Sequence, residues 1–260
     1  MFSRADSFPP RPAARRIAAL LWGLGLALAV HCADAAIGLE AATGNDGKLR
    51  PFKAEFVLEW RGMNAASASL ELTRQAAGHF TYISRNSARG MFRAVLPGEL
   101  IQTSRLRIEA AGVRPLSYRG DDGSADSRRD IALDFDWAQQ RVSGTAETQP
   151  VDLPLQPGVQ DIMSVQIAVI VDLLEGRTPT TYTLVDKNRI KEYLYADDGS
   201  ARLDTAVGPL DTVIWSSRRP GSDRVTRVWY APSLGYSPVK AERRDGKKLE
   251  WSMRLVKLDR

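Results

Sequence analysis

Cysteine and histidine, which carry much of enzyme and metal chemistry, are almost missing from this sequence of 260 residues. It holds one cysteine and two histidines. Cys32 and His31 lie beside an N-terminal apolar run that we expect to be removed, which leaves His79 as the one histidine of the mature chain. This excludes a disulfide scaffold, a cysteine nucleophile, an iron–sulfur cluster and a zinc site built from cysteine and histidine. A chain of this length buries enough surface to fold without such cross-links.

The N-terminus has the features of an export signal. Four arginines accompany an apolar run from Ile17 to Val30, which is too short to cross ~30 Å of hydrocarbon comfortably as a permanent helix. Ala33 and Ala35 are small residues at the positions that a signal peptidase reads, so we expect a signal peptide over residues 1–35 and cleavage before Ala36. The alternatives are a retained membrane anchor and a lipoprotein attached through the cysteine beside the run.

Charge along the rest of the chain is modest. The formal net charge is +5, and the removed segment carries four arginines and two aspartates, which leaves about +3. The remaining arginines alternate with acids along predicted strands and form no stripe for nucleic acid. The next apolar segment, Ile162 to Leu174, is interrupted by polar residues, so we expect no integral membrane span after cleavage. These features predict an exported, periplasmic protein without a nucleic-acid partner.

Alternation of apolar and polar residues with a period of two dominates the chain after a small, polar lead-in at 36–50, which we interpret as flexible. The alternation predicts strands with one buried and one wet face, and hence a mostly antiparallel sheet. The clearest runs cover residues 52–61, 68–73, 130–137 and 248–255. Asp245-Gly246 predicts a tight hairpin turn. Two identical Asp-Asp-Gly-Ser tetrapeptides, at 121–124 and 197–200, are interpreted as hairpin turns rather than calcium loops.

One segment departs from this period. Residues 161–175 show the pattern of a helix that Asp161 caps and Gly176 ends. Apolar side chains cover most of its circumference, which predicts burial on most sides. Its polar residues fall in one narrow stripe, made of Asp161, Ser164, Asp172 and Glu175.

Together these elements predict a mainly β fold: a strongly curved antiparallel sheet, an open or partial barrel, wrapped around a single buried α-helix. One domain over residues 51–258 accounts for the pattern, because no linker rich in proline, glycine or serine divides it. Strands around 210–215 and 225–230 are apolar on both faces, so we expect them at the centre of the sheet.

The order of several short motifs resembles a known family. The motifs are Gly112-Val113-Arg114-Pro115-Leu116-Ser117-Tyr118, Asp161-Ile162-Met163-Ser164, Gly208-Pro209-Leu210-Asp211-Thr212, Val228-Trp229-Tyr230 and Tyr236-Ser237-Pro238-Val239-Lys240. In this order they resemble the exported bacterial family of domain of unknown function 3108, over roughly residues 51–258. The resemblance implies a periplasmic location in Gram-negative bacteria, no established activity and no catalytic residue to transfer. The architecture is also similar in outline to the periplasmic lipoprotein carriers of the Lol system, although fold does not imply function.

Three side chains are candidates for a ligand site. Gln166 lies on the predicted helix away from the polar stripe, where a buried amide must find hydrogen-bond partners. It is either satisfied by the sheet or serves as the polar anchor of an apolar pocket. Trp215 and Trp229 lie on the two strands placed at the centre of the sheet, where their rings are either core or the lining of an acyl-chain site.

Other candidates for chemistry are weaker. His79 begins a strand without a nucleophile motif nearby, so we interpret it as an exposed residue beside a turn. Glu71 with Glu109, and Asp134 with Asp136, could flank a glycosidic bond. The two aspartates point to the face opposite the apolar residues of their strand, which favours simple solvation.

The sequence therefore predicts a non-enzymatic periplasmic protein without metal or cofactor that binds an apolar or amphipathic envelope ligand, such as a lipid or another acyl-containing molecule. The alternatives are an interaction or assembly factor that contacts an envelope protein, and an unrecognised hydrolase with an Asp, Glu or Ser site. A cavity of several hundred Å³ between helix and sheet would favour a ligand, and a solid core would favour a protein partner.

Overall fold

The computed structural model describes residues 48–260 except 77, 95 and 97. The predicted signal peptide and most of the lead-in lie outside the described residues. At the end of the lead-in, Leu49 is buried, and its carbonyl oxygen accepts a hydrogen bond from Arg74 (3.2 Å). No helix in this part of the chain is long and apolar enough to cross a membrane.

The described chain folds into fourteen strands, one α-helix and three short 3-10 helices. The strands are β1 (Phe52–Trp60), β2 (Met63–Arg74), β3 (His79–Ala88), β4 (Glu99–Glu109), β5 (Gly112–Asp121), β6 (Ile131–Asp136), β7 (Arg141–Ala146), β8 (Gln149–Pro154), β9 (Thr181–Asp186), β10 (Arg189–Thr205), β11 (Gly208–Arg218), β12 (Arg224–Ala231), β13 (Ser237–Asp245) and β14 (Lys248–Asp259). The helices are α2 (Ser164–Leu174), η1 (Gly90–Ala94), η2 (Ser127–Arg129) and η3 (Pro232–Leu234).

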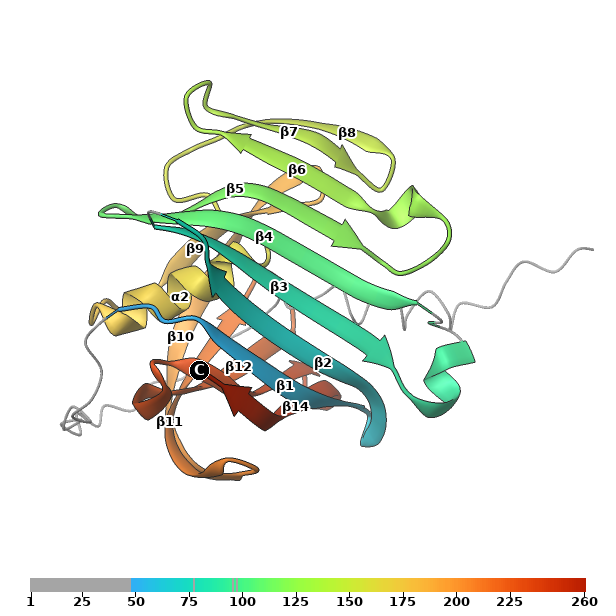
Figure 1. The fold of residues 1–260 in the computed structure, drawn as a ribbon, viewed down its shortest axis with the longest axis vertical. Coiled ribbons are helices and arrows are strands. Elements are labelled where there is room, and N and C mark those ends of the chain that lie inside the picture. The colour runs from blue at the N-terminus through green and yellow to red at the C-terminus, as the bar shows by residue number, and fades with distance from the viewer. Residues whose placement is uncertain (1–47, 77, 95, 97) are drawn as a thin grey trace, which may run out of the picture.

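All strands belong to one antiparallel sheet in the order β8-β7-β6-β5-β4-β3-β2-β1-β14-β13-β12-β11-β10-β9 (Figure 1). Consecutive strands pair with each other, except β8 and β9. In addition β1 pairs with β14, which joins the two ends of the described chain. The sheet is not closed, because β8 and β9 are its edges, and α2 connects them in sequence. The predicted mainly β, antiparallel class is confirmed.

The predicted central position of strands 210–215 and 225–230 is wrong. These residues belong to β11 and β12, which lie third and fourth from the β9 edge, whereas β1 and β2 occupy the centre. Both strands are apolar on two faces without being central, and η3 packs against β11.

Turn predictions succeed at hairpins and fail at the repeated tetrapeptide. Gly246 has a φ of 54° in the β13–β14 hairpin, as Asp245-Gly246 predicts. The segment at 121–124 instead opens the longer connection that contains η2, and the segment at 197–200 lies inside β10. There the register against β11 shifts between Asp197 and Ser200, so the extra residues form a bulge rather than a turn.

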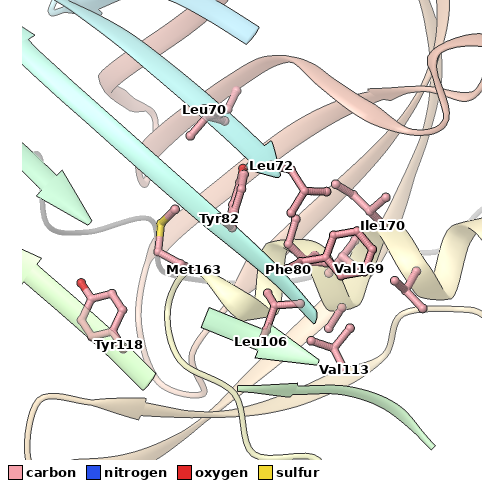
Figure 2. Close-up of a cluster of buried hydrophobic side chains, with 14 of the residues drawn as sticks. Leu70, Leu72, Phe80, Tyr82, Leu106, Val113, Tyr118, Met163, Val169 and Ile170 are labelled. Atoms are coloured by element: carbon pink, nitrogen blue, oxygen red, sulfur yellow. The ribbon is translucent and has the colours of Figure 1, made fainter. Parts of the chain in front are cut away.

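Helix α2 begins three residues later than predicted, because Asp161 caps a turn that precedes it. We call the face of the sheet that α2 contacts the inner face and the opposite face the outer face. Helix α2 packs against β4 and β5, and its Val169 and Ile170 lie near inner-face side chains (Figure 2). On β3–β5 the inner face comprises Phe80, Tyr82, Ser84, Asn86, Gln102, Ser104, Leu106, Val113 and Tyr118.

Replacing Gly144 by alanine is expected to cost about 2 kcal/mol, because overpacking is costly where backbone is close. A Cβ at Gly144 would lie 1.9 Å from the carbonyl oxygen of Ala132 on β6, and the φ of 142° strains any other residue. Chemical denaturation measures the loss. Gly62 is the control: it has a φ of 78° but no atom within 4 Å of its Cβ position, so Gly62→Ala should cost less. Equal losses would contradict the steric argument.

Candidate functional site

The carboxylate of Asp161 is the most deeply buried charge-bearing group at the start of α2. Its Oδ1 accepts hydrogen bonds from the backbone N–H groups of Met163 and Ser164, both at 2.7 Å, and its Oδ2 accepts one from the Ser104 hydroxyl at 2.6 Å. Burial raises the pKa of Asp161 to about 6, although these hydrogen bonds oppose the rise. The predicted polar stripe is therefore split: Asp161 and Ser164 are buried, whereas Glu175 is exposed. Whether each of these residues is buried depends on what packs around it in the fold, and helix periodicity cannot reveal that.

Gln166 is half-buried and faces the sheet, as the sequence indicates. Its Oε1 accepts a hydrogen bond from the Tyr82 hydroxyl at 3.1 Å, and its Nε2 donates to the carbonyl oxygen of Ile162 at 3.3 Å. Burial raises the pKa of Tyr82, so its hydroxyl stays protonated and donates. The amide is thus engaged within the protein, which is the structural alternative that the sequence left open.

Polar side chains continue along the inner face of β3–β5 beyond Gln166. The amide of Asn86 donates to the Ser84 hydroxyl at 3.0 Å, and the amide of Gln102 donates to the Tyr118 hydroxyl at 2.9 Å. All four side chains are buried. The sequence analysis did not identify this group. A signal was available, because the buried positions of β3 change from aromatic residues to small or polar ones after Tyr82.

The two candidate tryptophans lie on opposite faces of the sheet. Trp215 lies opposite Val228, and Trp229 lies opposite Ile214. The two rings therefore belong to neighbouring residue pairs of the β11–β12 ladder, and neighbouring pairs point to opposite faces of the sheet. The inner face follows the pairs Trp215–Val228, Val228–Ala241, Ala241–Met253 and Met253–Leu58. Trp215 is therefore an inner residue. The Trp229 ring lies on the outer face under the Lys240 ammonium, 4.1 Å from the ring centroid, and cannot share a site with Trp215.

A second polar group occupies the inner face on the other half of the sheet. Ser217, Thr226, Arg243 and Trp251 stand directly opposite one another on β11 to β14. All four are buried. Small and polar side chains therefore line the inner face on both halves.

The inner face is buried at both ends. Tyr82 and Ser104, which bond to the helix segment, are 0% exposed. Further along the same face, Asn86, Trp215 and Ser217 are also buried. The end away from the helix segment therefore places polar side chains beside an aromatic ring in a buried setting.

The weaker candidates stay separate. His79 lines a half-open cavity of about 380 Å³ with Gln75, Ala76, Phe80, Thr81, Arg105, Leu106 and Leu116, none of which is acidic. Glu71 pairs with Lys53 (3.3 Å) and Glu109 with Arg114 (2.9 Å), on strands that β3 separates.

The aspartates of β6 are exposed, as predicted. Asp134 pairs with Arg119 at 2.7 Å, and Asp136 accepts hydrogen bonds from the backbone of the β6–β7 turn. Both contacts are those of solvated surface side chains, which agrees with the interpretation from sequence.

One group of carboxylates could hold a cation. Oxygen atoms of Asp121, Asp122 and Asp130 lie within 4.8 Å of one another, so Asp130 supplies the further ligand that the first tetrapeptide lacks in sequence. Arg129 already lies 2.7 Å from Asp122, and its charge offsets part of the negative charge of the cluster. The side-chain hydroxyl of Ser124 also donates to Asp122, at 2.6 Å.

Comparison with known proteins gives a family and a fold. A family model described as "Protein of unknown function (DUF3108)" matches residues 55–247. The chain is similar to the beta-barrel-like protein of domain of unknown function DUF1849 from Brucella abortus, with 12% identity and a TM-score of 0.52 over 80% of this chain and 97% of that chain. At this identity the likeness shows the fold alone.

Two further solved structures are less similar. One is a Bacteroides fragilis protein described as exported, with a YmcC-like fold (10% identity, TM-score 0.36, 80% of this chain and 95% of that chain). The other is the MucA/MucB complex of Pseudomonas aeruginosa (13% identity, TM-score 0.34, 80% of this chain and 51% of that chain). Neither carries an argument about this chain. No curated protein matches the sequence at a significant level.

Proposed function

This chain belongs to the DUF3108 family of proteins of unknown function, and from its own geometry we propose that it is a non-enzymatic binding protein of the periplasm. In this proposal the sheet curves around α2 and holds an amphipathic, acyl-containing ligand against the inner face, at the end away from the helix. One observation carries it: at the end away from the helix, the inner face buries polar side chains, among them Asn86 and Ser217, beside the Trp215 ring. A mostly enclosed, mixed apolar and polar lining is typical of small-molecule sites.

The location of the site differs from the one expected from sequence. The helix segment is fully packed at Tyr82 and Ser104, and the Gln166 amide is already bonded. A ligand between α2 and the sheet would have to displace these contacts. A ligand at the end away from α2 would leave these contacts in place, so Trp215 stays in the proposed site, whereas Gln166 lies at its inner end and Trp229 lies outside it.

The two edge strands, β8 and β9, are poorly suited to a protein partner that would add a strand to the sheet. Two of the six residues of β8 are prolines, Pro150 and Pro154, which have no N–H to donate to an incoming strand. At β9, Gln160 already pairs with the backbone: its N–H donates to Thr183 (2.8 Å) and its carbonyl oxygen accepts from Val185 (2.9 Å). Edges protected in this way avoid intermolecular pairing.

The hydrolase alternative has two buried carboxyls to offer among the described residues, Asp122 and Asp161. Asp122 is paired with Arg129 at 2.7 Å. The two oxygens of Asp161 accept three hydrogen bonds from Met163, Ser164 and Ser104, which fits a structural cap rather than a group awaiting substrate. The proposal therefore keeps the protein non-enzymatic.

A brominated fatty acid tests the proposal, because bromine quenches tryptophan fluorescence only at short range. We expect saturable quenching at about ten micromolar probe, driven by buried apolar area less the costs of association. Trp215→Phe should remove a large part of the quenching. Trp229→Phe, the matched control on the outer face, should leave the quenched fraction unchanged. Absence of binding up to about 100 micromolar, or equal losses in both variants, would overturn the proposal in favour of an interaction factor.

A further inference from the structure

Three neighbouring side chains on the inner face form a row across β12, β13 and β14. Thr226 lies directly opposite Arg243, and Arg243 lies directly opposite Trp251. Each is nine-tenths or more buried, and the Arg243 guanidinium lies over the Trp251 ring, 5.5 Å from its centroid. A charged group at such depth needs a specific partner.

The polar atoms of this row are largely unpaired. The Thr226 hydroxyl oxygen and the Trp251 indole nitrogen are buried without a hydrogen-bond partner. Arg243 Nε lies 2.9 Å from Glu250 Oε2, but this contact lacks hydrogen-bond geometry, so neither atom has a hydrogen bond. Buried polar groups are nearly always satisfied by protein, water or ligand. Three adjacent side chains with unpaired atoms therefore indicate a site whose partner is not part of the protein.

The charges around the row leave Arg243 available to an anion. Glu250 is divided between two cations, because its carboxylate also lies 3.4 Å from Arg224. Arg224 in turn lies 3.5 Å from Asp245 at the hairpin end. Arg243 has five N–H donors and keeps its positive charge at any physiological pH. The ion pair with Glu250 joins Oε2 to Nε, and a guanidinium can bind a second, negatively charged acceptor through its remaining donors.

We propose that Arg243 binds the anionic end of the ligand, a carboxylate or a phosphate, with the Trp251 N–H and the Thr226 hydroxyl as additional donors. This inference rests on the proposed function and specifies its ligand class: an acyl chain with an acidic headgroup. The chain would extend along the inner face past Trp215 and Met253, and the headgroup would satisfy the unpaired donors. Guanidinium groups favour both acceptors because they bind them through paired N–H donors.

Calorimetric titration with dodecanoate, dodecyl phosphate and dodecanol tests the headgroup and separates its two sources. We expect at least one of the two acids to bind about tenfold more tightly than the alcohol. Arg243→Gln should weaken the acids about tenfold and change the alcohol less than twofold. Arg244→Gln is the matched control, because Arg244 adjoins Arg243 but pairs with Glu242 at 3.0 Å and is partly exposed. It should change neither.

Arg243→Gln leaves the Glu250 carboxylate without its partner, so Arg243→Gln combined with Glu250→Gln provides a variant without an unpaired charge. Thr226→Val and Trp251→Phe remove the two neutral donors with little change of shape, and each should weaken the acids but not the alcohol. Equal binding of acids and alcohol by the wild type would overturn the headgroup inference and leave the proposed function standing. Unchanged acid affinity in these variants would also overturn it. Failure of all three probes to bind would overturn the proposed function itself.

Discussion

Replacing Val169 by aspartate is expected to destabilise the protein severely, by several kcal/mol. Val169 is 0% exposed on α2 and belongs to the same core as inner-face residues such as Phe80 and Leu106 (Figure 2). A carboxylate there would lose its hydration without gaining a partner, at a cost of several kcal/mol. Domains are stable by only about 5–15 kcal/mol. Urea denaturation followed by circular dichroism and tryptophan fluorescence measures the loss.

Val207→Asp is the matched control, because Val207 is an exposed valine in the turn between β10 and β11. It should change the free energy of unfolding by less than about 0.5 kcal/mol. If Val169→Asp melts like the wild type, the burial of α2 is refuted. If both variants unfold alike, the effect belongs to added negative charge rather than to position.

The second large effect is a pH dependence that originates from Asp161. Its pKa is about 6 in the folded protein, above the 3.8 that is usual for an aspartate in an unfolded chain. The folded state therefore binds a proton more tightly than the unfolded chain, and between pH 4 and 6 it carries more protons. Stability must fall as the pH rises through this window. A difference of about two units between the folded and unfolded pKa values corresponds to about 3 kcal/mol of stabilisation. This stabilisation is fully lost once the pH lies above the folded pKa.

Asp161→Asn should remove this part of the pH dependence. An asparagine keeps the oxygen that accepts from Met163 and Ser164, and its amide can donate to the Ser104 hydroxyl. The free energy of unfolding, measured from pH 4 to 8, should fall less for the variant than for the wild type. Asp134→Asn, at an exposed position of β6, should keep the wild-type slope. If Asp161→Asn also keeps it, the buried carboxylate is not the origin of the effect.

Local patterns in the sequence were sufficient for the elements and for much of their burial. Alternation over residues 52–61 and 248–255 predicts β1 and β14, because the side-chain period of a strand equals two regardless of its partner. The all-round apolar stretch at 161–175 predicts a buried α2 for the same reason of periodicity. The resemblance to the DUF3108 family, which was based on the order of short motifs along the chain, is confirmed by the family match over residues 55–247.

Properties that need a partner strand were beyond the sequence. The pairing register puts Trp215 and Trp229 on opposite faces, although both are aromatic residues in apolar strands. The sheet order places β11 and β12 away from the centre, although their two-sided apolar pattern predicts a central position.

The candidate site shows the same division. A mainly antiparallel β protein with one apolar helix can be read from the chain alone, because those features follow from the spacing of side chains along a single segment. The folded structure was needed to learn that Asp161 is a buried cap bonded to Ser104, that Gln166 is bonded to Tyr82, and that Thr226, Arg243 and Trp251 stand in one row. Burial and hydrogen bonding of a polar group depend on residues distant in sequence, which the fold alone brings into contact.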